Sequence, residues 1–238
     1  MDDYRNSHQR LGEIYDDVLN NKFENILWEI EERCLKDIFV RYNINQESKV
    51  LDFACGTARI TSFLDTIFSN VTGVDISESM LDKAKKRDLR CKFILRDITK
   101  EPLDGKFDLL TSFRFFLNAN DELCNEVLQS LKKNMTKDSI FVFNIHGNRN
   151  SILGLIFFIQ KKLGMQGVLN TMSYRSIKNM FNNNGYEIIE YRGIGLFPGR
   201  KNVILLPQKL LIKTEILLGK IPFIRYFCKD YLFVVRLK

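Results

Sequence analysis

Residues 49–61, which read KVLDFACGTARIT, constrain the fold of this chain more than any other stretch. A short apolar run from Val50 to Ala54 stops at Gly56, and the residues that follow take on helical spacing. This order predicts a buried strand, a tight turn and a helix. Because Gly56 has no Cβ, the backbone there can approach a ligand, and the first helical turn offers unpaired N–H groups. The stretch is therefore typical of a nucleotide-binding turn.

A second apolar run ends in Asp75, about 19 residues after Gly56. An acidic residue at this place accepts hydrogen bonds from a ribose hydroxyl in dinucleotide-binding folds. The dinucleotide fingerprint also needs three glycines that admit a pyrophosphate, and residues 54–59 contain only one. The two strand ends therefore favour an adenosine-type ligand that has no pyrophosphate.

With Asp52 near the first strand tip, this segment resembles motif I of the class I S-adenosylmethionine-dependent methyltransferases, whose usual form is D-x-G-x-G-x-G. Asp52, Gly56 and Asp75 match the family pattern residue by residue. Ala54 and Ala58 stand where the family has its first and third glycines. We therefore expect a somewhat tighter loop than usual.

The resemblance continues through residues 75–81, DISESML, which are similar to the family's D-x-S-x-x-M-L, and through residues 96–98, RDI. Three elements in the right order are much more specific than one motif. The resemblance implies methyl transfer from S-adenosylmethionine, with S-adenosylhomocysteine as the product and no metal ion. The residues that it assigns to the cofactor are Tyr15, Asp52, Ala54, Gly56, Asp75, Ile76, Met80, Asp97, Ile98 and Phe113.

Within that set, Asp52 and Gly56 are assigned to the methionine end and Asp75 to the ribose hydroxyls. Ile76 and Met80 are assigned to the adenine face, and Asp97 with Ile98 to the adenine amine. Tyr15 lies on a predicted N-terminal helix that covers the cofactor in the family, and it is equally compatible with a position in the core of an amphipathic helix. These roles are implied by the resemblance.

Alternating strands and helices predict an α/β fold in which a parallel sheet carries helices on both faces. The resemblance makes this a doubly wound, Rossmann-like, seven-stranded sheet whose antiparallel last strand lies between the fifth and sixth. The predicted strands span 49–54, 71–75, 91–95, 107–113, 139–145, 186–191 and 231–237. The predicted helices span 8–19, 22–41, 58–68, 77–87, 121–133 and 173–182.

At 238 residues, the chain is expected to form one domain, 1–238. The expected N-terminal helical cover is 1–45. Segments 150–172 and 193–228 interrupt the later alternation, and we expect them to gather as a lid over the carboxyl ends of the fourth and fifth strands.

Two residues could carry chemistry near the methyl group. Arg114 follows the fourth strand in an aromatic surround and could clamp a phosphate or carboxylate. A surface ion pair with Asp108 or Asp121 is an equal alternative. His146 ends the fifth strand and could accept a proton from a substrate hydroxyl, because histidine titrates near neutrality. A purely structural histidine is the other interpretation.

Composition and charge indicate the cellular compartment in which we expect the protein. The five cysteines form no C-x-x-C pair, so neither a disulfide framework nor a zinc site is indicated. No apolar region of a signal peptide follows the charged N-terminus, and no apolar run approaches the length of a membrane span. We therefore expect a cytoplasmic protein. From Pro198 to Lys238 the chain has nine Lys and Arg and two acids, so this segment accounts for the whole net charge of +7.

That basic segment points to an anionic partner. Residues 205–221 have the pattern of a basic amphipathic helix, which could lie on an anionic membrane, roof the substrate pocket or pack on its own domain. We favour O- or N-methylation of a small molecule or glycan. A nucleic-acid methyltransferase is less favoured, because no D/N-P-P-Y/F motif is present. A non-catalytic methyltransferase-fold subunit is the third hypothesis.

Overall fold

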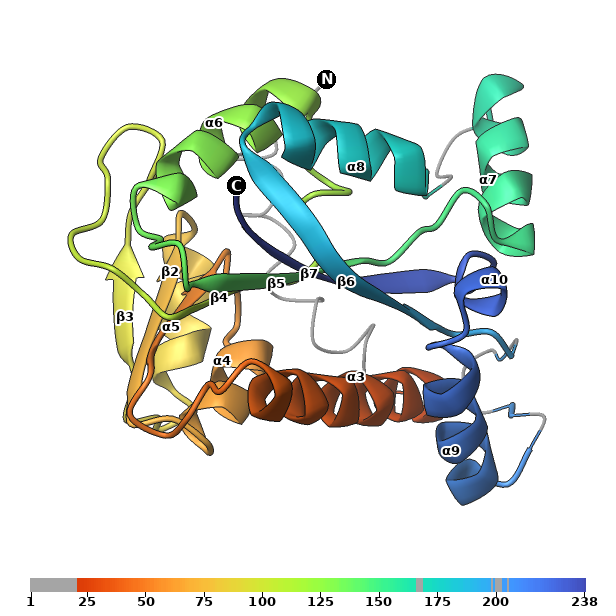
Figure 1. The fold of residues 1–238 in the computed structure, drawn as a ribbon, viewed down its shortest axis with the longest axis horizontal. Coiled ribbons are helices and arrows are strands. Elements are labelled where there is room, and N and C mark those ends of the chain that lie inside the picture. Colours follow the sequence, from red (N-terminus) through yellow and green to blue (C-terminus); the bar gives the residue numbers. More distant parts are fainter. Residues whose placement is uncertain (1–20, 166–168, 198, 200–202, 205) are drawn as a thin grey trace.

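A computed structural model describes residues 21–165, 169–197, 199, 203–204 and 206–238. Its centre is a seven-stranded sheet with the order β3-β2-β1-β4-β5-β7-β6 (Figure 1). The first five strands pair in parallel, and β7 pairs antiparallel with both β5 and β6. The expected doubly wound sheet, with the antiparallel last strand inserted between the fifth and sixth, is confirmed.

The strands are β1 Lys49–Phe53, β2 Asn70–Asp75, β3 Lys92–Leu95, β4 Leu109–Ser112, β5 Ile140–Ile145, β6 Tyr186–Ile194 and β7 Asp230–Leu237. The helices are α3 Lys22–Arg41, α4 Arg59–Asp65, α5 Glu78–Lys85, α6 Asp121–Lys132, α7 Ile152–Lys162, α8 Tyr174–Asn183, α9 Gln208–Leu218 and α10 Pro222–Arg225. The predicted helix 8–19 and Tyr15 lie outside the described residues.

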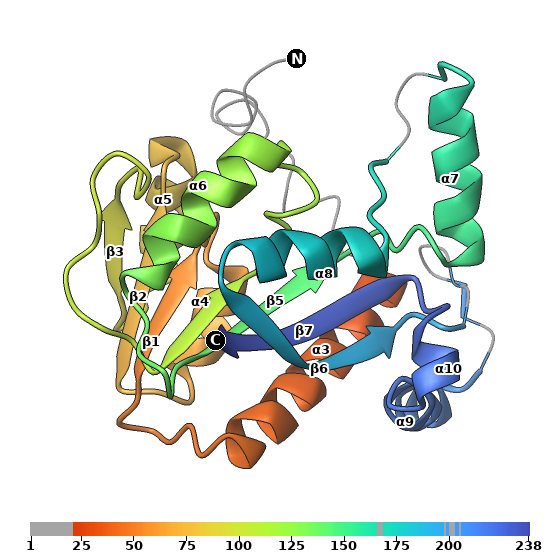
Figure 2. The ribbon, with the colours of Figure 1, turned by 45° about the horizontal axis from the view of Figure 1, so that its top comes forward.

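The sheet buries a different core on each face, because successive strand residues point to opposite sides. In β5, Phe141 and Phe143 join the core beneath α6 and α8, whereas Ile140 and Val142 join the core beneath α3, α4 and α9. Figures 1 and 2 show α6 and α8 on one side of the sheet and α3 on the other. The sequence shows this two-sided burial as nearly continuous apolar runs.

Side chains cap the starts of two helices beside the sheet. The Asn120 side chain accepts a hydrogen bond from the Leu123 N–H at the start of α6. Ser77 accepts one from the Met80 N–H at the start of α5. Each cap satisfies a backbone donor that has no partner within its helix.

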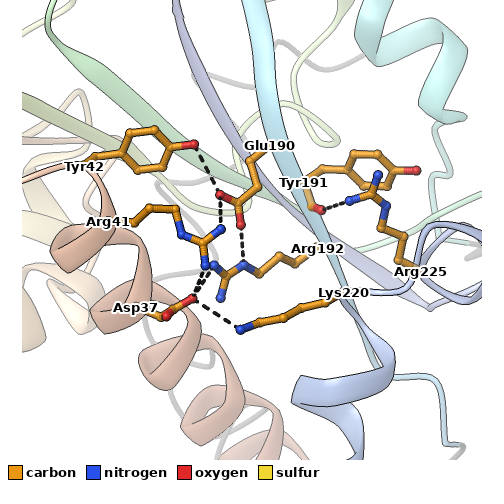
Figure 3. Close-up of polar contacts among 8 residues, drawn as sticks. All are labelled: Asp37, Arg41, Tyr42, Glu190, Tyr191, Arg192, Lys220 and Arg225. Atoms are coloured by element: carbon orange, nitrogen blue, oxygen red, sulfur yellow. Dashed lines mark hydrogen bonds and ion pairs between the residues drawn. The ribbon is translucent and has the colours of Figure 1, made fainter.

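A buried guanidinium joins α3 to the sheet edge (Figure 3). Arg192 of β6 bonds Glu190 through Nε at 2.7 Å and Asp37 of α3 through a terminal nitrogen. From the surface, Arg41 pairs with both carboxylates and Lys220 pairs with Asp37. Although burial of Asp37 opposes ionisation, the bonds and charges of Arg192, Lys220 and Arg41 lower the pKa of its carboxyl.

Helix α9 packs against α3, and Figure 1 shows it beside one end of that helix. Its Leu211 and Ile212 are buried against the α3 side of the core. Its Glu215 carboxylate accepts the N–H groups of residues 195–197, which fixes the chain after β6. Of the three interpretations of residues 205–221, this packing matches a helix on its own domain. None of the helices in the described ranges is long and apolar enough to cross a membrane.

Candidate functional site

The turn after β1 has three residues in the left-handed region. Ala54, Gly56 and Ala58 have φ angles of 55°, 55° and 65°. A Cβ added to Gly56 would meet no atom within 4 Å, so the space beside this glycine is open. Although two of the family's glycines are alanines, the loop keeps the backbone conformation that favours glycine at all three positions.

Asp52 is buried at the end of β1, beneath this turn. Thr61 Oγ1 donates to one carboxylate oxygen at 2.6 Å, and Thr111 Oγ1 donates to the other at 2.7 Å. Burial raises the pKa of Asp52 to about 6, and the two threonine bonds oppose that rise. The carboxylate is therefore ionised at neutral pH and is held in one orientation.

Asp75 links the ends of β1 and β2. One oxygen accepts the Gly56 N–H at 2.7 Å, and the other accepts the Ser77 N–H at 2.8 Å. The carboxylate therefore positions the turn after β1 and the start of α5 together. At a third strand end, Asp97 follows β3 and accepts bonds from the Thr99 N–H and hydroxyl.

These strand ends surround a pocket with an empty volume of about 970 Å³, part of it open to solvent. The residues predicted from the sequence that line it are Asp52, Ala54, Gly56, Asp75, Ile76, Met80, Asp97, Ile98, Phe113 and Arg114. Leu123 and Val127 of α6 also line it, and the sequence did not single them out because an apolar helix face looks the same over a pocket as over a core.

Arg114 lies at the pocket and pairs with a residue that the sequence did not single out. The Arg114 guanidinium donates to Glu24 Oε2 of α3 at 3.2 Å. The backbone N–H of Arg114 donates to Asn144 Oδ1 at 2.7 Å. The other Glu24 oxygen lies 3.9 Å from Lys229 Nζ. Two cations from distant parts of the chain therefore share one carboxylate beside the pocket.

His146 is not among the residues that line this pocket. Burial, followed by the charges of Arg114, Lys229 and Arg59, lowers the pKa of His146 to about 3. Among the described residues, its Nδ1 has no hydrogen-bond partner. Desolvation and the neighbouring cations therefore favour the neutral ring of His146. Its role as a base stays a prediction.

Replacing Ala54 with Gly is expected to stabilise the fold by about 1 kcal/mol, because an L-residue in the left-handed conformation carries a steric penalty that glycine avoids. Urea denaturation checks this result. Cofactor affinity should stay the same or rise, since the Ala54 methyl is removed from the pocket wall. Ala119→Gly, outside the left-handed region, is the control and should not stabilise. A loss of stability in Ala54→Gly would contradict the inference that the backbone of Ala54 is strained.

Acidic side chains at three neighbouring strand ends, with a left-handed turn between the first two, define a Rossmann-like fold with an adenosine-type cofactor pocket. This is the fold of the class I S-adenosylmethionine-dependent methyltransferases. Residues 44–185, more than half of the chain, match the family model described as a methyltransferase domain. The chain belongs to this methyltransferase domain family.

Curated proteins with similar sequences are also named as methyltransferases. Malonyl-[acyl-carrier protein] O-methyltransferase of Bacillus anthracis is 27% identical over 134 residues, which are 55% of this chain and 49% of that protein. The protein of the same name from Bacillus cytotoxicus is 30% identical over 140 residues, 56% of this chain and 47% of that protein. This chain therefore spans about half the length of the curated relatives that it matches.

A solved structure shows the same fold over the whole chain. Magnesium protoporphyrin IX methyltransferase of Synechocystis, with bound S-adenosylhomocysteine, superposes with a TM-score of 0.66. The alignment covers 99% of this chain and 100% of that one at 13% identity. At that level of identity, the similarity shows a shared fold and nothing more.

Proposed function

We propose that this protein transfers a methyl group from S-adenosylmethionine to a small molecule that carries a carboxylate. One observation carries the proposal: nine residues that the resemblance assigns to the cofactor line one pocket at the strand ends, together with Arg114. The cofactor supplies an electrophilic methyl group on a sulfonium sulfur.

The residues present are suited to that cofactor. The open space beside Gly56 leaves room for a ligand against the backbone. Asp52 carries a negative charge at neutral pH that suits the methionine ammonium group. Asp75 would accept bonds from the ribose hydroxyls, because a carboxylate oxygen can accept from a ligand as well as from a backbone N–H. Ile76 and Met80 give an apolar surface for adenine.

The charges beside the pocket support an anionic acceptor. Arg114 and Lys229 hold the Glu24 carboxylate between them. An acceptor carboxylate that displaced Glu24 from Arg114 would keep the guanidinium paired and would bring its oxygens to the pocket wall. Charge-assisted bonds of this kind are the stronger class of hydrogen bond.

A carboxylate acceptor also needs no general base at His146. Its oxygen already carries the attacking lone pair at neutral pH, so no residue has to remove a proton. Positioning and exclusion of water then account for the chemistry that the chain must provide. The curated relatives are named malonyl-[acyl-carrier protein] O-methyltransferases, and a malonyl group has a free carboxylate, which supports this acceptor class.

The activity is tested by calorimetry with S-adenosylmethionine, followed by mass spectrometry of methylated products. The acceptors are malonyl-N-acetylcysteamine and its amide analogue, in which a neutral carboxamide replaces the free carboxylate. We expect binding of the cofactor and a methyl ester from the carboxylate only. No binding of the cofactor would overturn the activity, whereas binding with methylation of neither compound would overturn the acceptor class.

Two substitutions should change acceptor affinity in opposite directions. Arg114→Gln is expected to raise KM for the carboxylate by about 10- to 150-fold, because a charge-assisted bond contributes about 1.5–3 kcal/mol. Glu24→Gln should lower KM, since the internal competitor loses its charge. Steady-state kinetics measure both effects, and Lys137→Gln on the exposed surface is the matched control. Equal effects of the two variants would contradict a shared anion site.

A further inference from the structure

Helix α7 exposes apolar side chains to an unusual degree. Gly154 is its one buried residue. Ile152 is 81% exposed, and Leu163, at the helix end, is 75% exposed. Further exposed apolar residues of the helix are Leu153, Leu155, Ile156 and Ile159. Soluble proteins rarely leave a contiguous apolar surface of this kind uncovered, and such surfaces mark interaction sites.

The apolar residues of α7 surround most of the helix. At 100° per residue, Ile152, Leu153 and Leu155 point in three directions, and the half-exposed Phe158 points in a fourth. A helix that is apolar on most sides is normally buried in a large core or in lipid. At 11 residues, α7 is too short to span a bilayer. Its exposed apolar side chains therefore need a cover that reaches several sides of the helix.

A second apolar group lies at the same end of the molecule. Both views show α10 beside the base of α7 (Figures 1 and 2). Phe223 of α10 is 76% exposed, and its ring contacts Phe227 with centroids 5.3 Å apart. Tyr226 packs on Phe227 in turn. Aromatic rings with one apolar and one wet side are enriched at membrane interfaces.

The sequence segments that contain these two helices carry positive charges only. The sequence has no acidic residue between Asp138 and Glu187, a stretch that contains all of α7. It has none between Glu215 and Asp230, a stretch that contains all of α10. Lys161 and Lys162 are exposed in the last turn of α7. Basic side chains that flank exposed apolar groups favour anionic lipid headgroups.

We propose that α7 and α10 form a docking surface for an anionic membrane. A lipid surface can cover α7 on several sides. An acidic protein or a second copy of this chain would cover one face of the helix and leave its other faces exposed to water. The sequence had suggested membrane contact through residues 205–221. The structure instead packs α9 of that segment on α3, and among the described residues the exposed apolar side chains of α7 and α10 have no such packing partner.

Docking in this way has a consequence for the pocket. β5 ends at Ile145 and α7 begins at Ile152, so only a short connection separates the helix from the carboxyl edge of the sheet. That connection is held by Asn148, whose amide donates to the carbonyl oxygens of Tyr226 and Cys228 beside α10. The docking surface is therefore tied to the edge of the sheet that carries the cofactor pocket.

Vesicle co-sedimentation tests the proposal with the full chain. Phosphatidylcholine vesicles that contain phosphatidylglycerol are compared with pure phosphatidylcholine vesicles. We expect the protein to bind the anionic vesicles and added salt to weaken the binding. Ile156→Asp should lower the partition coefficient at least about tenfold. Lys161→Gln and Lys162→Gln should each lower it about five-fold.

Val40→Asp, at an exposed apolar position near the end of α3, is the matched control and should bind like the wild type. Circular dichroism and binding of S-adenosylhomocysteine show that each variant is folded. Equal binding to both vesicle types, an equal loss in Val40→Asp, or no vesicle binding by the wild type would each overturn the proposal. A dimer in light scattering that Ile156→Asp dissociates would assign the surface to a second copy instead.

Discussion

Replacing Asp75 with Ala is expected to weaken binding of S-adenosylmethionine by roughly 1.5–3 kcal/mol, or about 10- to 150-fold, as measured by calorimetry. The carboxylate would contact the ribose hydroxyls, and it already holds the Gly56 and Ser77 N–H groups. The substitution removes a ligand contact and also loosens the turn that shapes the pocket. Both effects act in the same direction.

Two controls separate these causes. Asp75→Asn keeps one carbonyl oxygen that can accept the Gly56 N–H, so it should preserve more of the turn than Ala does. Asp82→Ala, on the exposed side of α5, should bind the cofactor like the wild type. If Asp75→Ala bound as tightly as the wild type, the assignment of this residue to the ribose would fail.

Replacing Arg192 with Ala is expected to reduce the free energy of unfolding by about 3 kcal/mol. Its side chain is 3% exposed, and its loss leaves the carboxylate of Glu190 without its buried cation. For a chain of this size, that loss corresponds to a fall in Tm of about 6–12 °C. Thermal and urea denaturation measure both quantities.

Arg41→Ala is the matched control, because Arg41 pairs with the same two carboxylates but has a side chain that is 47% exposed. Exposed ion pairs contribute little, so we expect a change of about 0.5 kcal/mol or less. Equal losses in the two variants would show that the contacts with the carboxylates, and not burial of the guanidinium, determine the effect. Activity should persist in both variants below their melting temperatures.

The sequence by itself determined the sheet and most of the cofactor pocket. Strand ends, helix caps and left-handed turns depend on residues close together in the chain, and the signals of Gly56, Asp75 and Asn120 are of this local kind. Parallel strands then bring their carboxyl ends to one edge, so acidic residues at three strand ends converge without further information.

Only the tertiary structure decided which distant side chains meet. Arg114 and Glu24 lie 90 positions apart in the sequence, and Arg192 and Asp37 lie 155 apart. Such pairs depend on how α3 crosses the sheet, which no local pattern specifies. The pKa of His146 and the exposure of α7 were decided in the same way, because desolvation and burial are properties of everything packed around a residue.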